Sequence, residues 1–308
     1  PVMSVINTDT MTTSVKKRTG ILITLAGGCL WGFSGACGQY LFTYKDACSD
    51  WLVPIRLTTA GLLLVLYYLF RRPEDNRRIW TNPGNTVTLI LYGILGMMLC
   101  QYSYFRAIET SNAGTATVLQ YLSPVLIMLV MCIWERRLPS MIHMLSILLA
   151  LAGIYLLATH GQPGQLVVSG QTLFWGLFSA VTVVLYNLIP RGLMNIYPTP
   201  FLLGWAMLIG GISLGLLRRP WQFRPVIDSA TVLCLTAVIL FGTIAAFSLY
   251  MQGVKLIGPE QASLYACIEP VAATLFSALW LHTSFTGMDF FGFLCILSTL
   301  FLITLFGR

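Results

Sequence analysis

The chain has 308 residues, of which 56% are hydrophobic and only 9% are charged. Soluble domains carry about 25% charged residues, so this composition excludes a soluble protein and predicts a polytopic membrane protein. The formal net charge of +7 does not indicate nucleic-acid binding, because the basic residues lie in short segments between apolar runs and form no basic stripe with interleaved aromatic residues.

Apolar runs long enough to cross a bilayer follow one another along the chain. A helix needs about 20 such residues to cross about 30 Å of hydrocarbon. The sequence predicts ten spans, at residues 20–42, 51–70, 85–108, 112–134, 141–159, 172–190, 200–217, 229–254, 260–281 and 287–307. Residues 1–19 are polar and then basic, and no small-residue cleavage site follows the first apolar run, so we expect a cytoplasmic N-terminal tail. The expected fold class is an all-α polytopic membrane protein with ten transmembrane helices.

Basic residues predict the orientation of these spans, because cytoplasmic loops are enriched in Lys and Arg. On the side of the N-terminus the loops and tails carry Lys16, Lys17, Arg18, Arg71, Arg72, Arg77, Arg78, Arg136, Arg137, Arg191, Lys255 and Arg308. The other side carries only Lys45, Arg218, Arg219 and Arg224. Both termini are therefore expected in the cytoplasm, and RRPWQFR at 218–224 is a local exception to the rule.

The residue types that carry catalysis or bind metals show no suitable spacing. Seven of the eight cysteines lie in apolar runs, where we expect them to be small packing residues, and only Cys48 falls in a predicted loop. His143, His160 and His282 lie near the ends of spans and share no ligand spacing. There is no nucleophile elbow, Walker loop or catalytic carboxylate pair. We therefore expect no enzymatic activity, no cofactor and no metal.

The apolar pattern repeats once along the chain. YLSPVLIMLVMCIW (121–134) aligns with CIEPVAATLFSALW (267–280), which pairs Pro124 with Pro270 at an offset of 146 residues. Five spans per repeat is an odd number, so the second repeat is expected upside down relative to the first. The predicted repeats are residues 20–159 and 172–308, joined by an outward-facing linker at 160–171. Inverted repeats are typical of transporters that bind substrate at the repeat interface; duplication for stability alone is the alternative.

Glycines support the same arrangement. Gly61 and Gly211 take equivalent places in the second and seventh spans. GGCLWGFSGACG at 27–38 carries Gly28 and Gly32 at GxxxG spacing, which predicts close packing of the first span against another helix.

Pro124 and Pro270 predict breaks within the fourth and ninth spans and are candidates for gating. Each proline removes the hydrogen bond of the backbone carbonyl four residues earlier, in Gln120 and Ala266. In a bilayer such carbonyls are tolerated only where they are buried in protein or face a wet cavity. The helix faces around them are small and polar, so both spans are expected to line a central space.

Polar and aromatic residues inside the spans are the candidates for substrate binding. Glu269 lies about 13 Å into its span, near the midplane, where a carboxylate is costly. It is either a proton carrier or an anchor for a substrate amine or hydroxyl, or else a hydrogen-bonded carboxyl that ties helices together. The candidate lining residues are Trp31, Gln101, Thr117, Gln120, Tyr186, Asn187, Ser263, Tyr265 and Glu269.

Arg56 and Arg106 are predicted to lie within one or two turns of the outer interface. Long basic side chains at that depth can snorkel to water, so we expect both arginines to snorkel or to form structural pairs. Holding a substrate carboxylate is the alternative interpretation.

Two segments resemble the repeated signature of the EamA transporters in the drug/metabolite transporter superfamily. They are YSYFRAIETSNAGTATVLQYLSPVLIMLVMCIWERRLPS (102–140) and SLYMQGVKLIGPEQASLYACIEPVAATLFSALW (248–280). The resemblance implies ten helices in two inverted five-helix repeats, a central cavity and export of small metabolites, amino acids among them. It also makes Glu135, at the cytoplasmic end of the fourth span, a gating candidate. The second copy departs from the signature there, because it has Leu281 followed by His282.

The expected function is that of a secondary, non-ATP transporter in a bacterial inner membrane that exports small organic metabolites by alternating access, with amino acids or related compounds as the expected substrates. Its partners would be a small-molecule substrate and the lipid bilayer, with no nucleic acid, and a monomer is expected, with a homodimer as the alternative. A nucleotide-sugar or sugar-phosphate carrier would need cations deep in the cavity, and the predicted places of Arg56 and Arg106 argue against it. A four-span multidrug extruder would need a Glu in the first span, which has none. A membrane enzyme or a scaffold without transport is the remaining alternative.

Overall fold

The computed structural model describes residues 2–134, 136, 138–162, 166–257 and 259–306, with side chains from Lys16 onward except those at 259, 260, 263, 264 and 304. Every regular element in this part of the chain is a helix. The first half contains α1 (Val2–Tyr44), α2 (Ser49–Arg71), α3 (Pro73–Thr81), α4 (Pro83–Leu91), η1 (Tyr92–Met98), α5 (Leu99–Thr110), α6 (Ala113–Gln120), α7 (Ser123–Trp134) and α8 (Met141–Thr159). The second half contains α9 (Gly170–Leu188), α10 (Arg191–Met194), α11 (Thr199–Arg218), η2 (Pro220–Gln222), α12 (Ser229–Ile239), η3 (Leu240–Ala245), α13 (Ala246–Ile257), α14 (Pro259–Ala266), α15 (Ile268–Leu279) and α16 (Gly287–Phe306).

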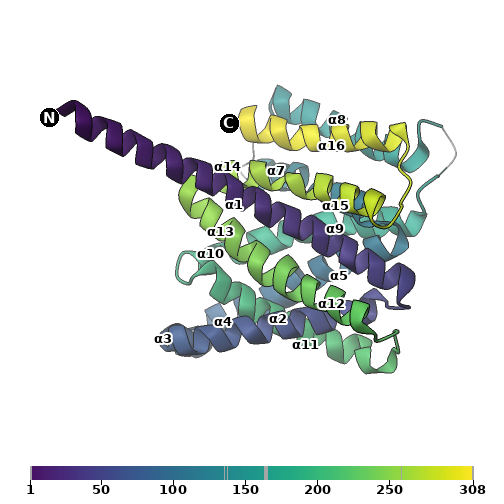
Figure 1. Ribbon diagram of the computed structural model, residues 1–308, viewed down its shortest axis with the longest axis horizontal. Helices are drawn as coiled ribbons and strands as arrows, with labels where there is room; N and C mark the ends of the chain where they lie inside the picture. Colours follow the sequence, from purple (N-terminus) through teal and green to yellow (C-terminus); the bar gives the residue numbers. More distant parts are fainter. Residues whose placement is uncertain (1, 135, 137, 163–165, 258, 307–308) are drawn as a thin grey trace.

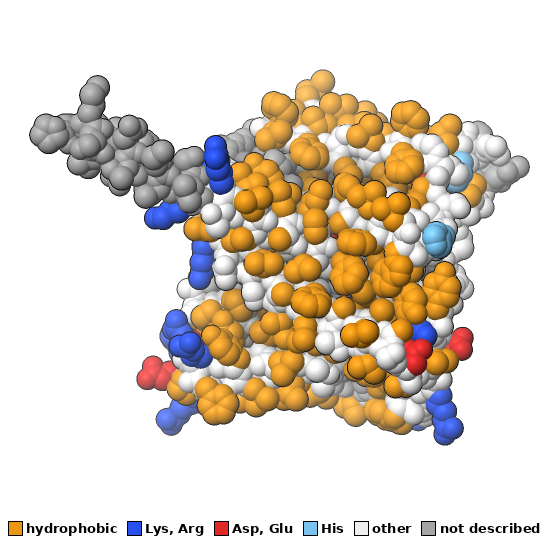
Figure 2. Space-filling model, in the orientation of Figure 1, with side chains coloured by type: hydrophobic (Ala, Val, Ile, Leu, Met, Phe, Trp, Pro, Cys, Tyr) orange, Lys and Arg blue, Asp and Glu red, His pale blue; other side chains and the backbone are white. Residues whose placement is uncertain are grey.

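Eight helical segments in the described part of the chain are long and apolar enough to cross a membrane, and they follow the first eight predicted spans. The segments are Lys16–Tyr44, Ser49–Arg71, Pro83–Thr110, Ala113–Trp134, Met141–Thr159, Gly170–Leu188, Thr199–Arg218 and Ser229–Ile257. Two shorter apolar helices, Ile268–Leu279 and Gly287–Ile303, lie where the ninth and tenth spans were predicted. In Figure 2 hydrophobic side chains cover the middle of the visible face and the charged side chains gather at its left and right margins. This distribution fits a bundle whose middle lies in hydrocarbon.

Several helices begin where short polar side chains can accept hydrogen bonds from the first free backbone N–H groups. Asn112 accepts from the Thr115 N–H at 2.8 Å, and Asp228 accepts from the Thr231 N–H at 2.9 Å. Ser140 accepts from the His143 N–H at the start of α8. Such caps contribute about 1 kcal/mol each, so the sequence fixes these boundaries locally.

The two halves pack around an approximate two-fold axis. Two helices of the first half pack against the equivalent helices of the second half: α2 lies along α11, and α8 lies along α16. Between these outer pairs, α1 packs against α13 and α15 of the second half, and α9 packs in the equivalent way against α5, α6 and α7 of the first half. Figure 1 shows α8 and α16 together at the top and α2 and α11 together at the bottom, with the other long helices between them.

Glycines permit these close contacts. A Cβ on Gly61 of α2 would collide with the backbone at Leu208 of α11, and a Cβ on Gly211 of α11 would collide with the backbone at Thr58 of α2. The predicted equivalence of Gly61 and Gly211 is thus visible as one reciprocal contact. Gly32 of α1 likewise lies against the backbone of α15 at Ala273, so the close packing predicted from the glycine spacing is confirmed.

Both halves contain a π-helical turn inside the third span of the repeat, which the sequence pattern did not predict. The turns η1 and η3 occupy residues 92–98 and 240–245 and overlap at the repeat offset of 146 residues. In η3 the Thr243 hydroxyl donates to the Val238 carbonyl at 3.0 Å, five residues back, which stabilises the wider turn. π turns are rare and occur frequently at functional sites.

The predicted breaks at the prolines are present. The fourth span is divided into α6 and α7 at Tyr121, and the segment predicted as the ninth span is divided into α14 and α15 at Cys267. These two residues are separated by the repeat offset, so both halves break at the same position. The freed Ala266 carbonyl accepts a hydrogen bond from the Tyr121 hydroxyl at 3.1 Å, as a carbonyl in a bilayer requires.

Candidate functional site

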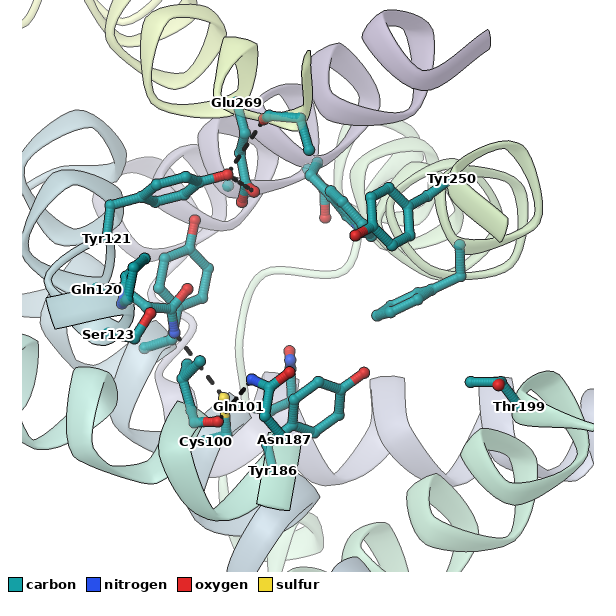
Figure 3. Close-up of a pocket in the computed structure, with 18 of the residues that line it drawn as sticks. Cys100, Gln101, Gln120, Tyr121, Ser123, Tyr186, Asn187, Thr199, Tyr250 and Glu269 are labelled. Atoms are coloured by element: carbon teal, nitrogen blue, oxygen red, sulfur yellow. Dashed lines mark hydrogen bonds between the residues drawn. The ribbon is translucent and has the colours of Figure 1, made fainter. Parts of the chain in front are cut away.

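A cavity of about 540 Å³ lies between the two halves, next to both breaks and to the π turn η1, which contributes Tyr92. Figure 3 shows polar side chains from α5, α6, α9 and α15 pointing into it. Among the described lining residues, Arg56 and Glu269 are the charged ones. The rest of the wall is aromatic, amide, hydroxyl or apolar, which is typical of sites that orient a small molecule with a few polar groups.

Several residues singled out in the sequence lie on this wall, and others do not. Those on the wall are Trp31, Gln101, Gln120, Pro124, Tyr186, Asn187 and Glu269. Of the described candidates, Thr117, Tyr265 and Pro270 are not on it. Thr117 lies one layer behind, where its hydroxyl is 2.8 Å from the Tyr104 hydroxyl. The Ser263 side chain and Glu135 fall outside the described residues.

Glu269 lies in the first turn of α15, immediately after the break. Its Oε2 accepts a hydrogen bond from the Tyr121 hydroxyl at 3.0 Å, and that same hydroxyl reaches the Ala266 carbonyl. The N-terminal end of a helix favours negative charge, so the break supplies a favourable place for a carboxylate inside an apolar bundle. Glu269 therefore contacts the opposite half of the protein through Tyr121.

Arg56 does not snorkel to the interface, so the snorkelling part of the sequence-based expectation is wrong. Its side chain is buried, with 5% of the residue exposed, and it borders the cavity. Its Nε donates to Thr243 Oγ1 at 3.1 Å, and its Nη1 donates to Gln101 Oε1 at 2.9 Å. The guanidinium also stacks over Phe105, 4.8 Å from the ring centre. Counting turns from the start of α2 gave the depth of Arg56 along the helix. It did not show that Arg56 lies on the side of α2 that faces the interior of the bundle.

Arg106 behaves as predicted. Its guanidinium pairs with Glu109 one turn later on α5, at 2.9 Å, with about a third of the arginine side chain exposed. Glu109 also accepts from the Ser49 N–H at 2.9 Å, which fixes the start of α2. The pair is structural and lies at the end of the bundle, away from the cavity.

Aromatic rings that the sequence did not single out form much of the wall. The ring of Trp31 lies edge-on to Phe247, with centroids 5.0 Å apart, and 5.3 Å from Tyr250. The wall also includes Tyr92, Tyr104, Phe105 and Tyr121. The available signal for Tyr121 was its position next to the proline break. There it lies between the end of α6 and the start of α7.

The two ends of the cavity differ. Toward the end of the bundle where α1 begins, the wall includes Thr199 at the start of α11 and Met194, which is exposed. At the other end, Gln39 lies one turn beyond the last cavity residue of α1. Its Oε1 accepts from the Ala113 N–H at 2.9 Å and the Ser277 hydroxyl at 2.8 Å, and its Nε2 donates to Thr283 at 2.9 Å.

Aromatic stacking adds to the Gln39 contacts. The rings of Tyr40 and Trp280 stack with centroids 5.3 Å apart, directly beside Gln39. One end of the cavity therefore reaches the surface, and the other is closed by polar and aromatic contacts that join α1, α6 and α15. We call this set, Gln39 with Ala113, Ser277 and Thr283, the Gln39 seal.

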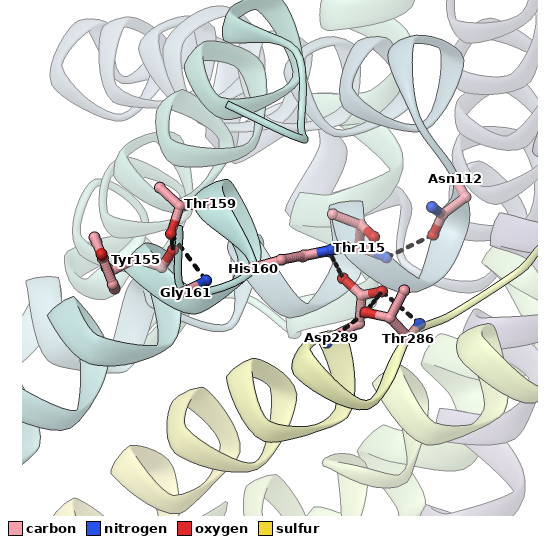
Figure 4. A network of polar contacts seen from close by, with 8 residues as sticks. All are labelled: Asn112, Thr115, Tyr155, Thr159, His160, Gly161, Thr286 and Asp289. Atoms are coloured by element: carbon pink, nitrogen blue, oxygen red, sulfur yellow. Dashed lines mark hydrogen bonds and ion pairs between the residues drawn. The ribbon is translucent and has the colours of Figure 1, made fainter. Parts of the chain in front are cut away.

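A second polar network lies outside the cavity, where α8 ends and α16 begins (Figure 4). His160 Nε2 lies 2.9 Å from Asp289 Oδ1, and Asp289 Oδ2 accepts from the Thr286 N–H at 2.7 Å. His160 has a left-handed backbone that ends α8. The network caps two helices and joins them. The described residues contain no group of three His, Cys, Asp or Glu side chains arranged to hold a metal.

The fold and the cavity define a polytopic helical membrane protein with a central polar site shared by two similar halves. The chain belongs to the EamA-like transporter family, whose pattern matches it twice, over residues 18–159 and 170–305. The resemblance inferred from the two signature segments is thus confirmed.

Similar proteins agree with this assignment. The chain is 37% identical over 291 residues to the "Uncharacterized inner membrane transporter YicL" of Salmonella typhimurium, covering 94% of this chain and 97% of that protein. It is 24% identical to the "Uncharacterized transporter sll0355" of Synechocystis, covering 94% and 91%. A crystal structure of a protein with 18% identity superposes with a TM-score of 0.61 over 94% of this chain and 97% of the other, which supports the fold alone.

Proposed function

We propose that the protein is a secondary transporter that exports small organic metabolites, amino acids or related compounds, by alternating access around the central cavity. The observation that carries the proposal is the difference between the two ends of that cavity: one reaches the surface, and the other is closed by the Gln39 seal. A site between two halves, open to one side only, is what alternating access requires of each of its end states.

The topology we propose has ten spans in two inverted repeats. In it, α14 and α15 together form the ninth span, and α16 forms the tenth. The reciprocal packing of α2 with α11 and of α8 with α16 supports this, together with the equivalent breaks and π turns. The repeats proposed are residues 20–159 and 172–308, and the unit is a monomer.

Charge and similarity support the membrane and the direction of transport that we propose. The relative from Salmonella is described as an inner membrane transporter, and the excess of Lys and Arg on the side of the termini favours a cytoplasmic location for both ends. With that orientation the open end of the cavity faces the cytoplasm, which is the state that loads a substrate for export.

Opening the other side would require the Gln39 seal to break while the cytoplasmic ends of α9 and α11 approach that of α13, which already packs against α1 and α14. Because the two halves share their packing, exchange of their conformations provides the second state. The Glu269–Tyr121 contact crosses between the halves near the midplane, so a proton or a substrate that reaches Glu269 would bias the exchange. Proton coupling and facilitated diffusion both fit this geometry.

A nucleotide-sugar or sugar-phosphate carrier is the second candidate, and Arg56 favours it. The objection that the arginines are too far from the cavity does not apply to Arg56, which borders it. The cavity nevertheless holds a carboxylate as well as a guanidinium, and a doubly negative phosphate would be repelled by Glu269. The exporter of amino acids or related compounds therefore fits the charges better.

The test is counterflow in proteoliposomes with a panel of the twenty L-amino acids, simple amines, sugar phosphates and nucleotide sugars. We expect accumulation of at least one labelled amino acid against unlabelled substrate without ATP, and no chemical conversion of it. Absence of counterflow for every compound, with protein that is folded and correctly inserted, would contradict the transport function.

A further inference from the structure

The cavity wall carries two opposite charges that do not neutralise each other directly. Arg56 and Glu269 both border it, and among the described residues neither forms an ion pair. Removing an ionised group from water without a charged partner is unfavourable. An arrangement that keeps two such groups apart in one cavity leaves both of them for a ligand.

Neutral groups hold the Arg56 guanidinium in one orientation. Thr243 accepts from Nε and Gln101 accepts from Nη1, while the ring of Phe105 supports one face. Among the described residues no hydrogen-bond partner is found for Nη2. The planar guanidinium binds carboxylates with defined geometry, and this one is fixed in advance, so it loses little conformational freedom when it binds.

Glu269 lies on the opposite wall. In Figure 3 Glu269 and Tyr121 lie on one side of the cavity, and Gln101, which holds Arg56, lies on the other with Tyr186 and Asn187. Tyr121 contacts Glu269 Oε2 at 3.0 Å, which leaves acceptor positions of the carboxylate for a donor in the cavity. The rings of Trp31 and Tyr250 border the space between.

We propose that the cavity binds a small zwitterion at two points, with its carboxylate on Arg56 and its ammonium group at Glu269 beside Tyr121. The inference rests on the proposed transport function and deepens it, because it assigns the two groups of an amino acid to two residues. A zwitterion neutralises both wall charges, whereas an amine lacking a carboxylate leaves Arg56 uncompensated and a carboxylate lacking an amine leaves Glu269 uncompensated. Buried polar groups left unpaired are what makes such sites discriminate.

Arg56 also connects α2 to η3 through Thr243, so a purely structural role must be separated from ligand binding. A structural brace affects folding and transport of every substrate alike. A carboxylate-binding residue affects substrates that carry a carboxylate and has little effect on those that lack it. The experiment therefore compares ligands that share a side chain and differ only in the charged groups.

The first measurement uses the wild-type protein and two matched sets of ligands. One set is L-leucine, 3-methylbutylamine and 4-methylpentanoate, and the other is L-phenylalanine, 2-phenylethylamine and 3-phenylpropanoate. Each is tested as a competitor of counterflow and as a thermal stabiliser in detergent. We expect the amino acid of at least one set to bind about ten- to a hundredfold more tightly than both of its analogues, the range for a lost charge-assisted hydrogen bond. Equal binding within both sets, or no binding by either amino acid, overturns the proposal.

The second measurement uses variants. Arg56→Gln should weaken the binding of the amino acid. The factor should equal the ratio between the affinities of the wild type for the amino acid and for the amine that lacks the carboxylate. The affinity of Arg56→Gln for the amine should be that of the wild type. Arg56→Lys, which keeps the charge, should give an intermediate loss and serves if Arg56→Gln does not fold. Thr243→Val removes one of the two hydrogen bonds that orient Arg56, so it should reduce the preference for the amino acid over the amine only in part. Arg106→Gln removes a paired arginine outside the cavity and should keep the full preference.

If Arg56→Gln or Arg56→Lys retains the full preference of the wild type, Arg56 is a brace and the proposal fails. If Thr243→Val loses the preference as completely as Arg56→Gln does, the connection to η3 accounts for the effect and the proposal fails in the same way. Counterflow of other compounds by wild type, with no discrimination between amino acid and amine, would leave the transport function standing and overturn only the zwitterion site.

Discussion

The two halves of the molecule share their backbone features but not their charges. Both contain a π turn in the third span, a break at an offset of 146 residues and a glycine in the α2–α11 contact. At the breaks, however, Ser123 of the first half takes the place that Glu269 has in the second. Helices α2 and α11 begin at Ser49 and Thr199, and the position in α11 equivalent to Arg56 is Ala206.

This difference separates two kinds of requirement. Features needed for the conformational exchange must occur in both halves, because each half takes the role of the other in the second state. A ligand with distinct groups has no two-fold symmetry, so the residues that bind it need not be duplicated. We therefore expect paired substitutions of duplicated features to have similar effects, and paired substitutions at the charged positions to have different ones.

The largest expected effect is on the duplicated glycine contact. Gly61→Leu and Gly211→Leu each place a side chain against the backbone of the partner helix, and each should cost about 3 kcal/mol of stability, the upper part of the range for overpacking. The measurement is the yield of monodisperse protein in detergent and its melting temperature. Gly192→Leu is the control, because no atom lies near a Cβ at that position. A large loss in one variant and none in the other would show that the contact is not shared equally.

A smaller loss is expected where Tyr121 joins the halves. Tyr121→Phe removes the hydroxyl that serves both the Ala266 carbonyl and Glu269, and leaving a buried acceptor unsatisfied costs about 1–3 kcal/mol. The melting temperature should fall accordingly, and Tyr155→Phe, at an exposed tyrosine of α8, should leave it unchanged. Equal stability of the two variants would mean that the Ala266 carbonyl finds another partner.

The Gln39 seal should control access from the closed end. Gln39→Ala removes three hydrogen bonds between α1 and its neighbours, so the closed end should open more often. In a background without the native cysteines, Ser34→Cys places a single thiol at a buried cavity residue of α1. A membrane-impermeant maleimide added from that side should label this thiol several-fold faster when Gln39→Ala is also present. The exposed Gln252 supplies the control, Gln252→Ala. Unchanged labelling in Gln39→Ala would show that other contacts close this end.

The smallest effect concerns an ion pair at the surface. Lys45 Nζ lies 2.5 Å from Asp228 Oδ2 and joins the end of α1 to the start of α12. The hydrogen bond from Lys45, with that from the Thr231 N–H, lowers the pKa of Asp228 to about 2. A carboxylate whose pKa is lowered by folding stabilises the folded state above its unfolded pKa of about 3.9, and that contribution is lost as the pH falls through the folded pKa.

For this pair we expect Asp228→Asn to lower the melting temperature by a few degrees at most, by the same amount at every pH between 5 and 8. The difference from wild type should shrink only as the pH approaches the folded pKa of Asp228. Melting curves of both proteins across this range check the prediction. A difference that changes between pH 6 and 8 would show that the pair is coupled to another titrating group.

Much of the architecture could be predicted from the sequence, because it depends on local signals. The prolines gave both breaks, and glycine spacing gave the closest helix contacts. The π turns were missed because they depend on a local widening, stabilised in η3 by Thr243, that leaves no mark in the hydrophobic pattern. Within the site, Glu269 and Gln120 were found because a polar residue in an apolar run is conspicuous.

Tyr121 was not singled out, and the environment of Arg56 was misjudged for a physical reason. Distance along a helix from its end gives depth in the bilayer, but the face that a residue presents depends on packing that only the assembled bundle defines. Arg56 lies only two turns into α2, yet the side of the helix that carries it, with the buried Val53 and Leu57, faces the interior. The apolar residues on either side of Arg56 in the sequence were the available signal that this side of α2 faces the interior.

The central claim is that the two similar halves form one substrate site, to which the first half contributes the positive charge of Arg56 and the second half the negative charge of Glu269. Counterflow of the best amino acid substrate in proteoliposomes, measured in parallel for wild type, Glu269→Gln and Ser123→Ala, tests it most directly. The account predicts a loss of about tenfold or more for Glu269→Gln, the scale of a lost charge-assisted hydrogen bond, and nearly unchanged counterflow for Ser123→Ala. Equal activity of all three proteins, or equal loss in both variants, would contradict it.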